Sequence, residues 1–362
     1  MCRFRLLIAE DDEQDLTTCR DSVERFQHEK KRPIELVECR QASEAIEKLN
    51  GSFDGAIIDL KLDQGGDEGN QVIKRIVDSY FRIPVAIMTG TPGNADPQFK
   101  YIGVFKKGET SYTEILELFF RIHDTGLTRI MGGRGILEQT LNEVFLTNLL
   151  PQQEAWMAYG QTDPLATEKA LLRFTLNHLM YLLDDPGLKC YPEEAYIYPP
   201  HSADLNTGSI TKRKSNGLLY AVLNPACDLV VRGNGDFKTD RILIVEIEAR
   251  QNIFDSLLSG ITSQATKKKQ LKTVLGNNYT DYFHWLPRTD FFEGGFINFR
   301  KISTVTKDEF GSQYQVPFIQ ISPPFVKDIV ARFSSYYARQ GQPDIECSRI
   351  INEIISVPEG SG

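Results

Sequence analysis

The chain has 362 residues, which is enough for two domains that each bury a core. Its net charge of -8 excludes the strongly basic surface that is typical of proteins whose main partner is nucleic acid. No apolar run is long enough for a signal peptide or a membrane-spanning helix, and the six cysteines form no CxxC pair. We therefore expect a cytoplasmic protein with reduced thiols and no membrane partner.

Residues 1–125 alternate short apolar stretches with amphipathic ones. Five stretches have the length of buried strands, namely FRLLIA, IELVEC, GAIIDL, IPVAIMTG and YIGVFKK. The segments between and after them have helical spacing, and the last, SYTEILELFFRIHD, is the longest amphipathic one. Fully apolar strands that alternate with helices indicate a doubly wound parallel sheet. The pattern predicts a flavodoxin-like five-stranded α/β domain, whose site lies beyond the carboxyl ends of the strands.

Chemically active side chains follow four of these strands. They comprise three acids, a hydroxyl and two adjacent amines: Glu10, Asp11, Asp59, Thr89, Lys106 and Lys107. Carboxylates that are crowded at a strand end repel one another unless they are solvated or hold a cation. A helix N-terminus also favours acids, and Asp12 and Glu13 fit that simpler role. For Glu10 and Asp11 we favour a metal site beside Asp59.

This arrangement resembles the receiver domain of two-component response regulators, over about a third of the chain. The resemblance implies that Asp59 is a phosphoacceptor, modified by a partner histidine kinase with Mg²⁺. Glu10 and Asp11 match the acidic pair that holds the ion, with Asp11 as a direct ligand. The backbone carbonyl of Lys61 would be a further ligand. Oxygen ligands of this kind suit magnesium.

The resemblance also assigns the residues that contact the phosphoryl group. Thr89 matches the hydroxyl that bonds a phosphoryl oxygen, and Lys106 matches the lysine that pairs with it. Lys107 is the alternative lysine. Catalysis of phosphoryl transfer consists mostly of positioning and charge stabilisation, which these groups can supply.

The segment after Thr89 departs from the receiver pattern. GTPGNADPQFK, residues 90–100, carries Pro92 and Pro97 where a receiver has its fourth helix, and two prolines in eleven residues preclude a proper helix. Gly103 occupies the usual position of an aromatic switch residue, and no proline follows Lys106. We therefore expect the face that reports phosphorylation to be remodelled.

Residues 126–189 are predicted to be a helical connector. GLTRIMGGRG, residues 126–135, carries four glycines and is the expected hinge. Helical spacing follows at 136–150 and 165–185. His178 lies among apolar residues of the second helix, and we interpret it as a core or interface histidine.

Residues 190–362 are predicted to form an α+β output domain, with a small β-sheet or barrel and flanking helices. The segments NPACDLV, HWLP and RFSSYYARQGQPD are similar to an uncharacterised bacterial family that carries a Cys-Asp-Leu motif in a core strand and an Arg-x-Gly-x-Pro ending. That family has no established chemistry. Atypical receivers fused to unusual effectors occur in bacterial anti-phage signalling systems, and this resemblance suggests a role in antiviral defence.

Two weak catalytic patterns occur in this half. Asp228 followed by Glu246 and Glu248 is similar to the Asp…Glu-x-Lys core of restriction-type nucleases, but Glu248 replaces the lysine. The simpler interpretation places the two glutamates on the solvent face of a strand. Cys227 could act as a nucleophile with His201 or His284, although no ordered triad is visible. Whether the chain is an enzyme stays open.

A basic segment, TKKKQLK at 266–272, precedes several aromatic residues and could contact nucleic acid or an acidic partner. Adjacent lysines on a helix are more often a solvated face. We therefore predict a response regulator with Asp59 as phosphoacceptor and an interaction module as output. A nucleic-acid-acting effector, or a phosphate sink that serves a sibling regulator, remains the alternative.

Overall fold

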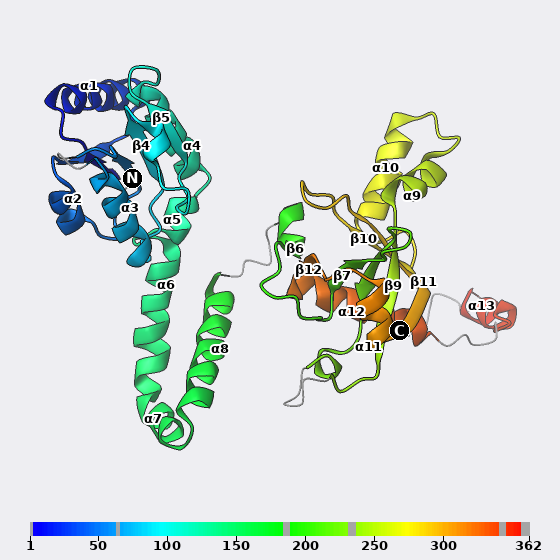
Figure 1. Ribbon diagram of the computed structural model, residues 1–362. Helices are drawn as coiled ribbons and strands as arrows, with labels where there is room; N and C mark the ends of the chain where they lie inside the picture. Colours follow the sequence, from blue (N-terminus) through cyan, green and yellow to red (C-terminus); the bar gives the residue numbers. More distant parts are fainter. Residues whose placement is uncertain (1–2, 63–65, 184–188, 231–236, 340–344, 356–362) are drawn as a thin grey trace, which may run out of the picture. The chain divides into compact units, whose positions relative to one another are not determined.

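The computed structural model describes residues 3–62, 66–183, 189–230, 237–339 and 345–355 (Figure 1). The chain forms two compact units, residues 1–186 and 187–362. Each unit has its own sheet and its own core, so each is described by itself. The helices predicted as a connector belong to the first unit.

The first unit contains a five-stranded parallel sheet with the order β2-β1-β3-β4-β5, as predicted. In this flavodoxin-like order, the carboxyl ends of β1, β3, β4 and β5 lie along one edge. Its strands are β1 (Phe4–Ala9), β2 (Ile34–Cys39), β3 (Gly55–Ile58), β4 (Val85–Thr89) and β5 (Gly103–Lys106).

Helices cover both faces of this sheet (Figure 1), because its strands carry apolar side chains on both sides. Two helices contribute to the core on one face and two to the core on the other. The first pair is α2 (Ala42–Lys48) and α3 (Glu68–Asp78), and the second pair is α1 (Glu13–Lys30) and α4 (Tyr112–Asp124). The sequence marks two helix starts: Asp12 caps α1, and Ser111 forms a capping box with Glu114 in α4.

The segment after β4 contains only the short 3₁₀ turn η1 (Pro92–Asn94), so the expected loss of a helix is confirmed. Side-chain hydrogen bonds tie this loop to α3. Asn70 Nδ2 donates to the Asn94 carbonyl at 3.1 Å, and Asn70 Oδ1 accepts from the Asp96 amide at 3.4 Å. The loop is therefore held against the helix that follows Asp59.

The chain then continues into a helical arm, and Figure 1 shows α8 running back beside α6. Arg134 fastens the start of the arm to the residue before β3, because its Nη2 donates to Asp54 Oδ2 at 2.7 Å. The elements are α5 (Leu127–Met131), α6 (Ile136–Val144), a π turn (Phe145–Leu149), a 3₁₀ turn (Leu150–Gln152), α7 (Gln153–Thr162) and α8 (Pro164–Leu183). The glycine-rich hinge segment thus contains a short helix.

The second unit has a curled antiparallel sheet with the order β10-β11-β9-β8-β7-β12-β6, which confirms the predicted α+β class. The long strand β11 changes register against β9 between Ile297 and Ile302, and this irregularity bends the sheet. The strands are β6 (Tyr196–Ile197), β7 (Ser209–Lys212), β8 (Leu219–Val222), β9 (Arg241–Glu248), β10 (Phe283–Leu286), β11 (Gly295–Thr306) and β12 (Ile319–Ile321).

Helices complete the cores on the two sides of this sheet, with α12 (Pro323–Tyr337) on one side and α11 (Lys307–Gln313) on the other. The remaining elements are η4 (Pro192–Ala195), η5 (Ala226–Asp228), α9 (Arg250–Leu258), α10 (Gln264–Leu275) and α13 (Ser348–Ile355). Across the described residues, no helix combines the length and the apolar character needed to cross a bilayer.

The Cys-Asp-Leu segment does not lie in a core strand, contrary to the sequence-based expectation. Strand β8 ends at Val222, and Cys227 and Asp228 lie in the 3₁₀ turn η5. Pro225 has no amide hydrogen for a ladder hydrogen bond, which accounts for the early end of the strand. The predicted Arg-x-Gly-x-Pro ending falls mainly on residues 340–344, outside the described residues.

Candidate functional site

The carboxyl ends of β1, β3 and β4 bring buried polar side chains to one edge of the first sheet. Glu10 is 1% exposed, Asp59 is 5% exposed and Thr89 is 1% exposed. The Asp59 amide donates to the Ala9 carbonyl at 2.9 Å, so the ends of β1 and β3 are held directly side by side. Two carboxylates at such burial require a cation nearby.

Lys107 supplies one such cation. Its Nζ lies 2.7 Å from Asp59 Oδ2, 2.7 Å from Glu10 Oε2 and 2.8 Å from Asp15 Oδ2. A single ammonium thus donates hydrogen bonds to three carboxylates, one of them on the first turn of α1. Charge-assisted hydrogen bonds of this length are the strong ones.

The structure therefore does not place Lys106, the first choice from the sequence, at Asp59. Lys106 Nζ pairs with Glu109 Oε1 at 2.5 Å on the surface. Successive side chains of a strand point to opposite faces. At the end of β5 this alternation turns Lys106 outward and Lys107 toward Asp59, while the Lys107 amide still bonds the Thr89 carbonyl at 3.0 Å.

The protonation of this cluster follows from burial and from its partners. Burial raises the pKa of Glu10 to about 7, against the lowering effect of Lys107. For Lys107, burial alone would lower the pKa, but hydrogen bonds to Asp15, Asp59 and Glu10 outweigh it and raise the pKa above its ordinary value. Lys107 is therefore a permanent cation beside Glu10, whose carboxyl group is costly to charge.

The acidic side chains fit a divalent cation. Glu10, Asp11 and Asp59 each offer a carboxylate oxygen, and these oxygens lie within 4.8 Å of one another. The set consists of hard oxygen donors, which suits Mg²⁺ better than zinc or copper. Asp11 is exposed, so this side of the cluster is open to an entering ion. The ligand role of the Lys61 carbonyl stays a prediction; the Lys61 amide donates to Asp59 Oδ1 at 3.2 Å.

The neighbouring acids have the structural roles expected of them. Asp12 accepts hydrogen bonds from the amides of Gln14 and Asp15, which makes it the N-cap of α1. Glu13 pairs with Arg40 on the surface. Asp15 was not predicted as part of the site. Its spacing from Glu10, across the start of a helix, gave no sign that it reaches the same lysine.

Close backbone packing fixes the position of Asp59 from the other side. A Cβ on Gly69, at the start of α3, would lie 2.1 Å from the Asp59 carbonyl oxygen and 2.6 Å from Leu60 Cα. The Gly69 amide donates to the Leu60 carbonyl at 3.0 Å. Only glycine lets α3 approach the end of β3 this closely.

Thr89 connects the site to the remodelled loop. Its Oγ1 accepts a hydrogen bond from the Thr91 amide at 3.4 Å. On the neighbouring strand β5, Gly103 has no side chain, and the ring of Phe105 lies over it. A Cβ on Gly103 would lie 2.3 Å from Phe105 Cζ. The space above Gly103 is therefore filled by the aromatic ring of the residue two positions further along β5.

The nuclease-like acids of the second unit are not brought together. Asp228 follows the carboxyl end of β8 and pairs with Lys238 at 3.5 Å. Because β8 and β9 are antiparallel, Glu246 and Glu248 lie toward the opposite end of this strand pair. Both pair with Lys301 of β11, at 2.7 Å and 3.1 Å. The two half-buried glutamates thus share one exposed lysine on the sheet.

The cysteine–histidine pattern is not assembled around Cys227 either. Cys227 is exposed on η5, and its Sγ lies 3.7 Å from Asp228 Oδ1. His201 and His284 line two different cavities. The lysines of 266–272 lie on α10, and the aromatic rings of Tyr282 and Phe283 pack with core rings instead of forming a platform beside them.

Among known proteins, solved structures resemble the first unit of this chain. No family model matches the chain, and no curated protein matches it. The first unit is similar to the N-terminal domain of a response regulator/sensory box/GGDEF 3-domain protein from Carboxydothermus hydrogenoformans, at 20% identity and a TM-score of 0.28 over 34% of this chain and 98% of that one.

Two further structures match the same part of the chain. A response regulator receiver protein from Sinorhizobium medicae is 16% identical, with a TM-score of 0.27 over 34% of this chain and 95% of that one. The phosphorylated cyanobacterial phytochrome response regulator RcpA is 18% identical, with a TM-score of 0.26 over 35% of this chain and 94% of that one.

Proposed function

We propose that the first unit is the phosphoacceptor domain of a response regulator, and that Asp59 is the residue phosphorylated. One observation carries this proposal: Lys107 Nζ lies 2.7 Å from both Asp59 and Glu10, with the Asp11 carboxylate in the same cluster. A buried carboxylate flanked by an ammonium and by two more acids is suited to accept a phosphoryl group with a divalent cation.

The reaction transfers a phosphoryl group from a phosphohistidine or an acyl phosphate. An oxygen of Asp59 forms a bond to phosphorus while the bond from phosphorus to the donor's histidine nitrogen or acyl oxygen breaks. The donor leaves with the bonding electron pair. Lys107 and the Thr89 hydroxyl would hold phosphoryl oxygens, so that charge spread over these oxygens is stabilised by groups already in place. A histidine kinase is the expected donor.

Glu10, Asp11 and Asp59 are the residues that would hold Mg²⁺. When bound, the ion would neutralise phosphoryl oxygens and orient them toward Asp59. The role of the protein is to keep its acids close together and partly desolvated. Gly69 contributes to this by letting α3 pack against the Asp59 backbone.

The same contacts indicate how phosphorylation would alter the domain. A phosphoryl group adds about -1.5 to -2 charges at neutral pH. Lys107 would move its hydrogen bonds toward this group and weaken its bond to Asp15 on α1. To donate its hydroxyl hydrogen to a phosphoryl oxygen, Thr89 would reorient and weaken the bond that its Oγ1 accepts from the Thr91 amide. Thr91 begins the loop that Asn70 holds against α3, so this change would reach that loop.

The second unit is the proposed output domain, with an interaction or ligand-binding role. A nuclease output is disfavoured because Asp228 pairs with Lys238 beside η5, away from Glu246 and Glu248, which share Lys301 on the sheet. A phosphate-sink role would require no output. It would be supported if Asp59→Asn left every output unchanged and raised phosphate on a sibling regulator.

The test is phosphorylation of the full-length protein. Wild type and Asp59→Asn are incubated with acetyl phosphate and Mg²⁺, and the intact mass is measured. We expect the mass of one phosphoryl group on wild type, none on Asp59→Asn, and none when EDTA removes the metal. Asp12→Asn is the matched control, because asparagine still caps α1 and Asp12 is outside the cluster. It should be phosphorylated like wild type.

Two outcomes would contradict the proposal. One is a wild type that gains no phosphoryl group from acetyl phosphate or from histidine kinases. The other is equal modification of Asp59→Asn, which would place the phosphoryl group on a different residue.

A further inference from the structure

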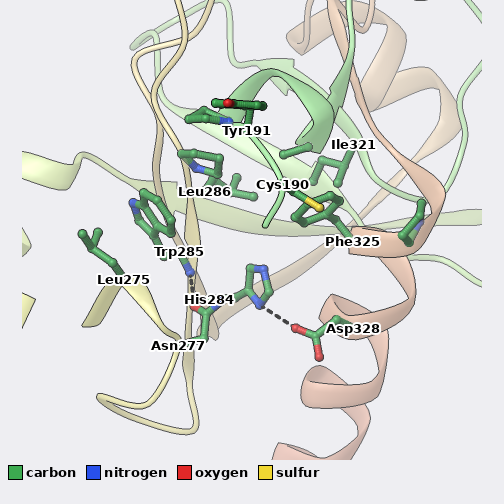
Figure 2. Close-up of a pocket in the computed structure, with 14 residues that line it drawn as sticks. Cys190, Tyr191, Leu275, Asn277, His284, Trp285, Leu286, Ile321, Phe325 and Asp328 are labelled. Carbon is green, nitrogen blue, oxygen red and sulfur yellow. Dashed lines mark hydrogen bonds and ion pairs between the residues drawn. The ribbon is translucent and has the colours of Figure 1, made fainter. Parts of the chain in front are cut away.

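A cavity of about 440 Å³ lies in the second unit, between the edge strand β10 and the first turns of α12 (Figure 2). Its walls are mostly apolar and aromatic, with Trp285 and Leu286 from β10, Phe325 from α12 and Tyr191 from the segment before η4. This volume lies in the range of small-molecule sites. Among its lining residues, Asp328 is the one that carries a charge at neutral pH.

His284 is the buried polar group of this cavity. It is 3% exposed, and its Nδ1 has no hydrogen-bond partner among the described residues. Burial, reinforced by the charge of Arg332, lowers the pKa of His284 to about 3, so the imidazole is neutral at physiological pH. A buried polar atom without a hydrogen bond destabilises the fold, and a ligand that bonds to it could recover that loss.

Asp328 faces this imidazole from α12, and Figure 2 shows the two side chains pointing toward each other. Asp328 Oδ2 lies 3.6 Å from His284 Nδ1, which is too long for a hydrogen bond. The Asp328 side chain is 61% exposed, and no cationic side chain among the described residues pairs with it. Arg332, one turn further along α12, donates instead to the carbonyls of Thr280 and Phe283.

We propose that this cavity binds an organic amine with an aromatic body, held by His284 and Asp328. An ammonium nitrogen roughly 2.8 Å from each acceptor can bridge two atoms that are 3.6 Å apart. It would donate one hydrogen bond to neutral Nδ1 and one to the carboxylate. The aromatic body would contact Trp285, Tyr191 and Phe325, and such rings also attract a cation. Anions are disfavoured because the lining offers them a carboxylate and no cation.

The test compares two probes of similar size on the full-length protein. Phenethylamine carries the ammonium, and phenylacetate carries a carboxylate on the same ring. Dissociation constants come from ligand-observed NMR titrations. We expect phenethylamine to bind wild type about tenfold or more tightly than phenylacetate, because the sign of its charge matches Asp328. The substitution Asp328→Asn should weaken the binding of phenethylamine by a similar factor.

Asp281→Asn is the matched control, since Asp281 is an exposed acid that pairs with Arg339 and does not line the cavity. It should bind phenethylamine like wild type. Chemical shifts of the His284 ring should move when phenethylamine is added, which ties binding to this cavity without a substitution in the core. Equal affinities for the two probes, no binding of phenethylamine, or unchanged binding in Asp328→Asn would each overturn the proposal.

Discussion

The two units differ in how they accommodate buried titratable groups. In the first, Glu10 and Asp59 are buried together and share the charge of Lys107. In the second, His284 is buried as a neutral ring, and its neighbour Asp328 remains exposed. The difference follows from sheet topology. The ends of parallel strands gather side chains from several strands at one edge. In the antiparallel sheet, charges such as Glu246 and Lys301 pair across neighbouring strands instead.

The tight packing behind Asp59 gives the largest expected effect on stability. Gly69→Ala places a methyl group against the Asp59 carbonyl, and overpacking of this kind costs about 1–3 kcal/mol. We expect a lower free energy of unfolding in urea and slower phosphorylation by acetyl phosphate. Gly93→Ala is the control, because a Cβ there meets nothing within 4 Å. If the two variants behave alike, the packing of α3 does not position Asp59.

The neutral His284 makes the second unit sensitive to acid. Its pKa is about 3 in the folded state, against 6.5 when exposed. Below pH 6.5 the unfolded chain binds a proton that the folded chain excludes, so stability falls as the pH falls. The slope from this group approaches about 1.4 kcal/mol per pH unit. The nearby Asp328 carboxylate would favour protonation of His284. Burial and the charge of Arg332 both oppose it, and burial has the larger effect.

Urea unfolding of the full chain between pH 5 and 6.5, followed by fluorescence, measures this slope. His284→Gln should have the shallower slope, and His201→Gln should keep that of wild type. An NMR titration of the His284 ring provides a check that needs no substitution. A His284 pKa near 6.5 in the folded protein would contradict the account.

The smallest effect is expected at the nuclease-like acids. Asp228 and Glu246 are half-buried, but each pairs with an exposed lysine, so Asp228→Asn combined with Glu246→Gln should change the free energy of unfolding by only about 1 kcal/mol. Urea unfolding measures this change. A plasmid-nicking assay with Mg²⁺ should detect no activity in wild type or in the variant. Magnesium-dependent nicking that the variant loses would restore the nuclease hypothesis.

The sequence was most informative where an apolar strand pattern is followed directly by residues with chemically active side chains. Apolar strands ending in acids predicted the parallel sheet and the edge at which Glu10, Asp59 and Thr89 meet. It did not decide between Lys106 and Lys107. Neighbouring side chains at the end of β5 point to opposite faces, so a shift of one residue decides which lysine reaches Asp59. The participation of Asp15 depends on the direction of α1 relative to β5, which spacing along the chain does not encode.

The second unit was harder to predict for a physical reason. Its sheet pairs strands far apart in sequence, such as β12 with β7 and β6, so local pattern says little about which side chains meet. His284 appeared as one partner of Cys227, but the fold places it opposite Asp328 on α12. Pairing of this kind follows from packing of the whole domain.

A comparison of the two adjacent lysines tests most directly whether Lys107 acts on the group transferred to Asp59. Lys107→Ala and Lys106→Ala are incubated with acetyl phosphate and Mg²⁺, and the phosphorylated fraction is followed by intact mass. The account predicts that Lys106→Ala behaves like wild type, because Lys106 pairs with Glu109 away from the site. Lys107→Ala should be phosphorylated about tenfold or more slowly, because it loses a cation placed against the transferred group. Loss of phosphorylation in Lys106→Ala, with Lys107→Ala unaffected, would contradict it.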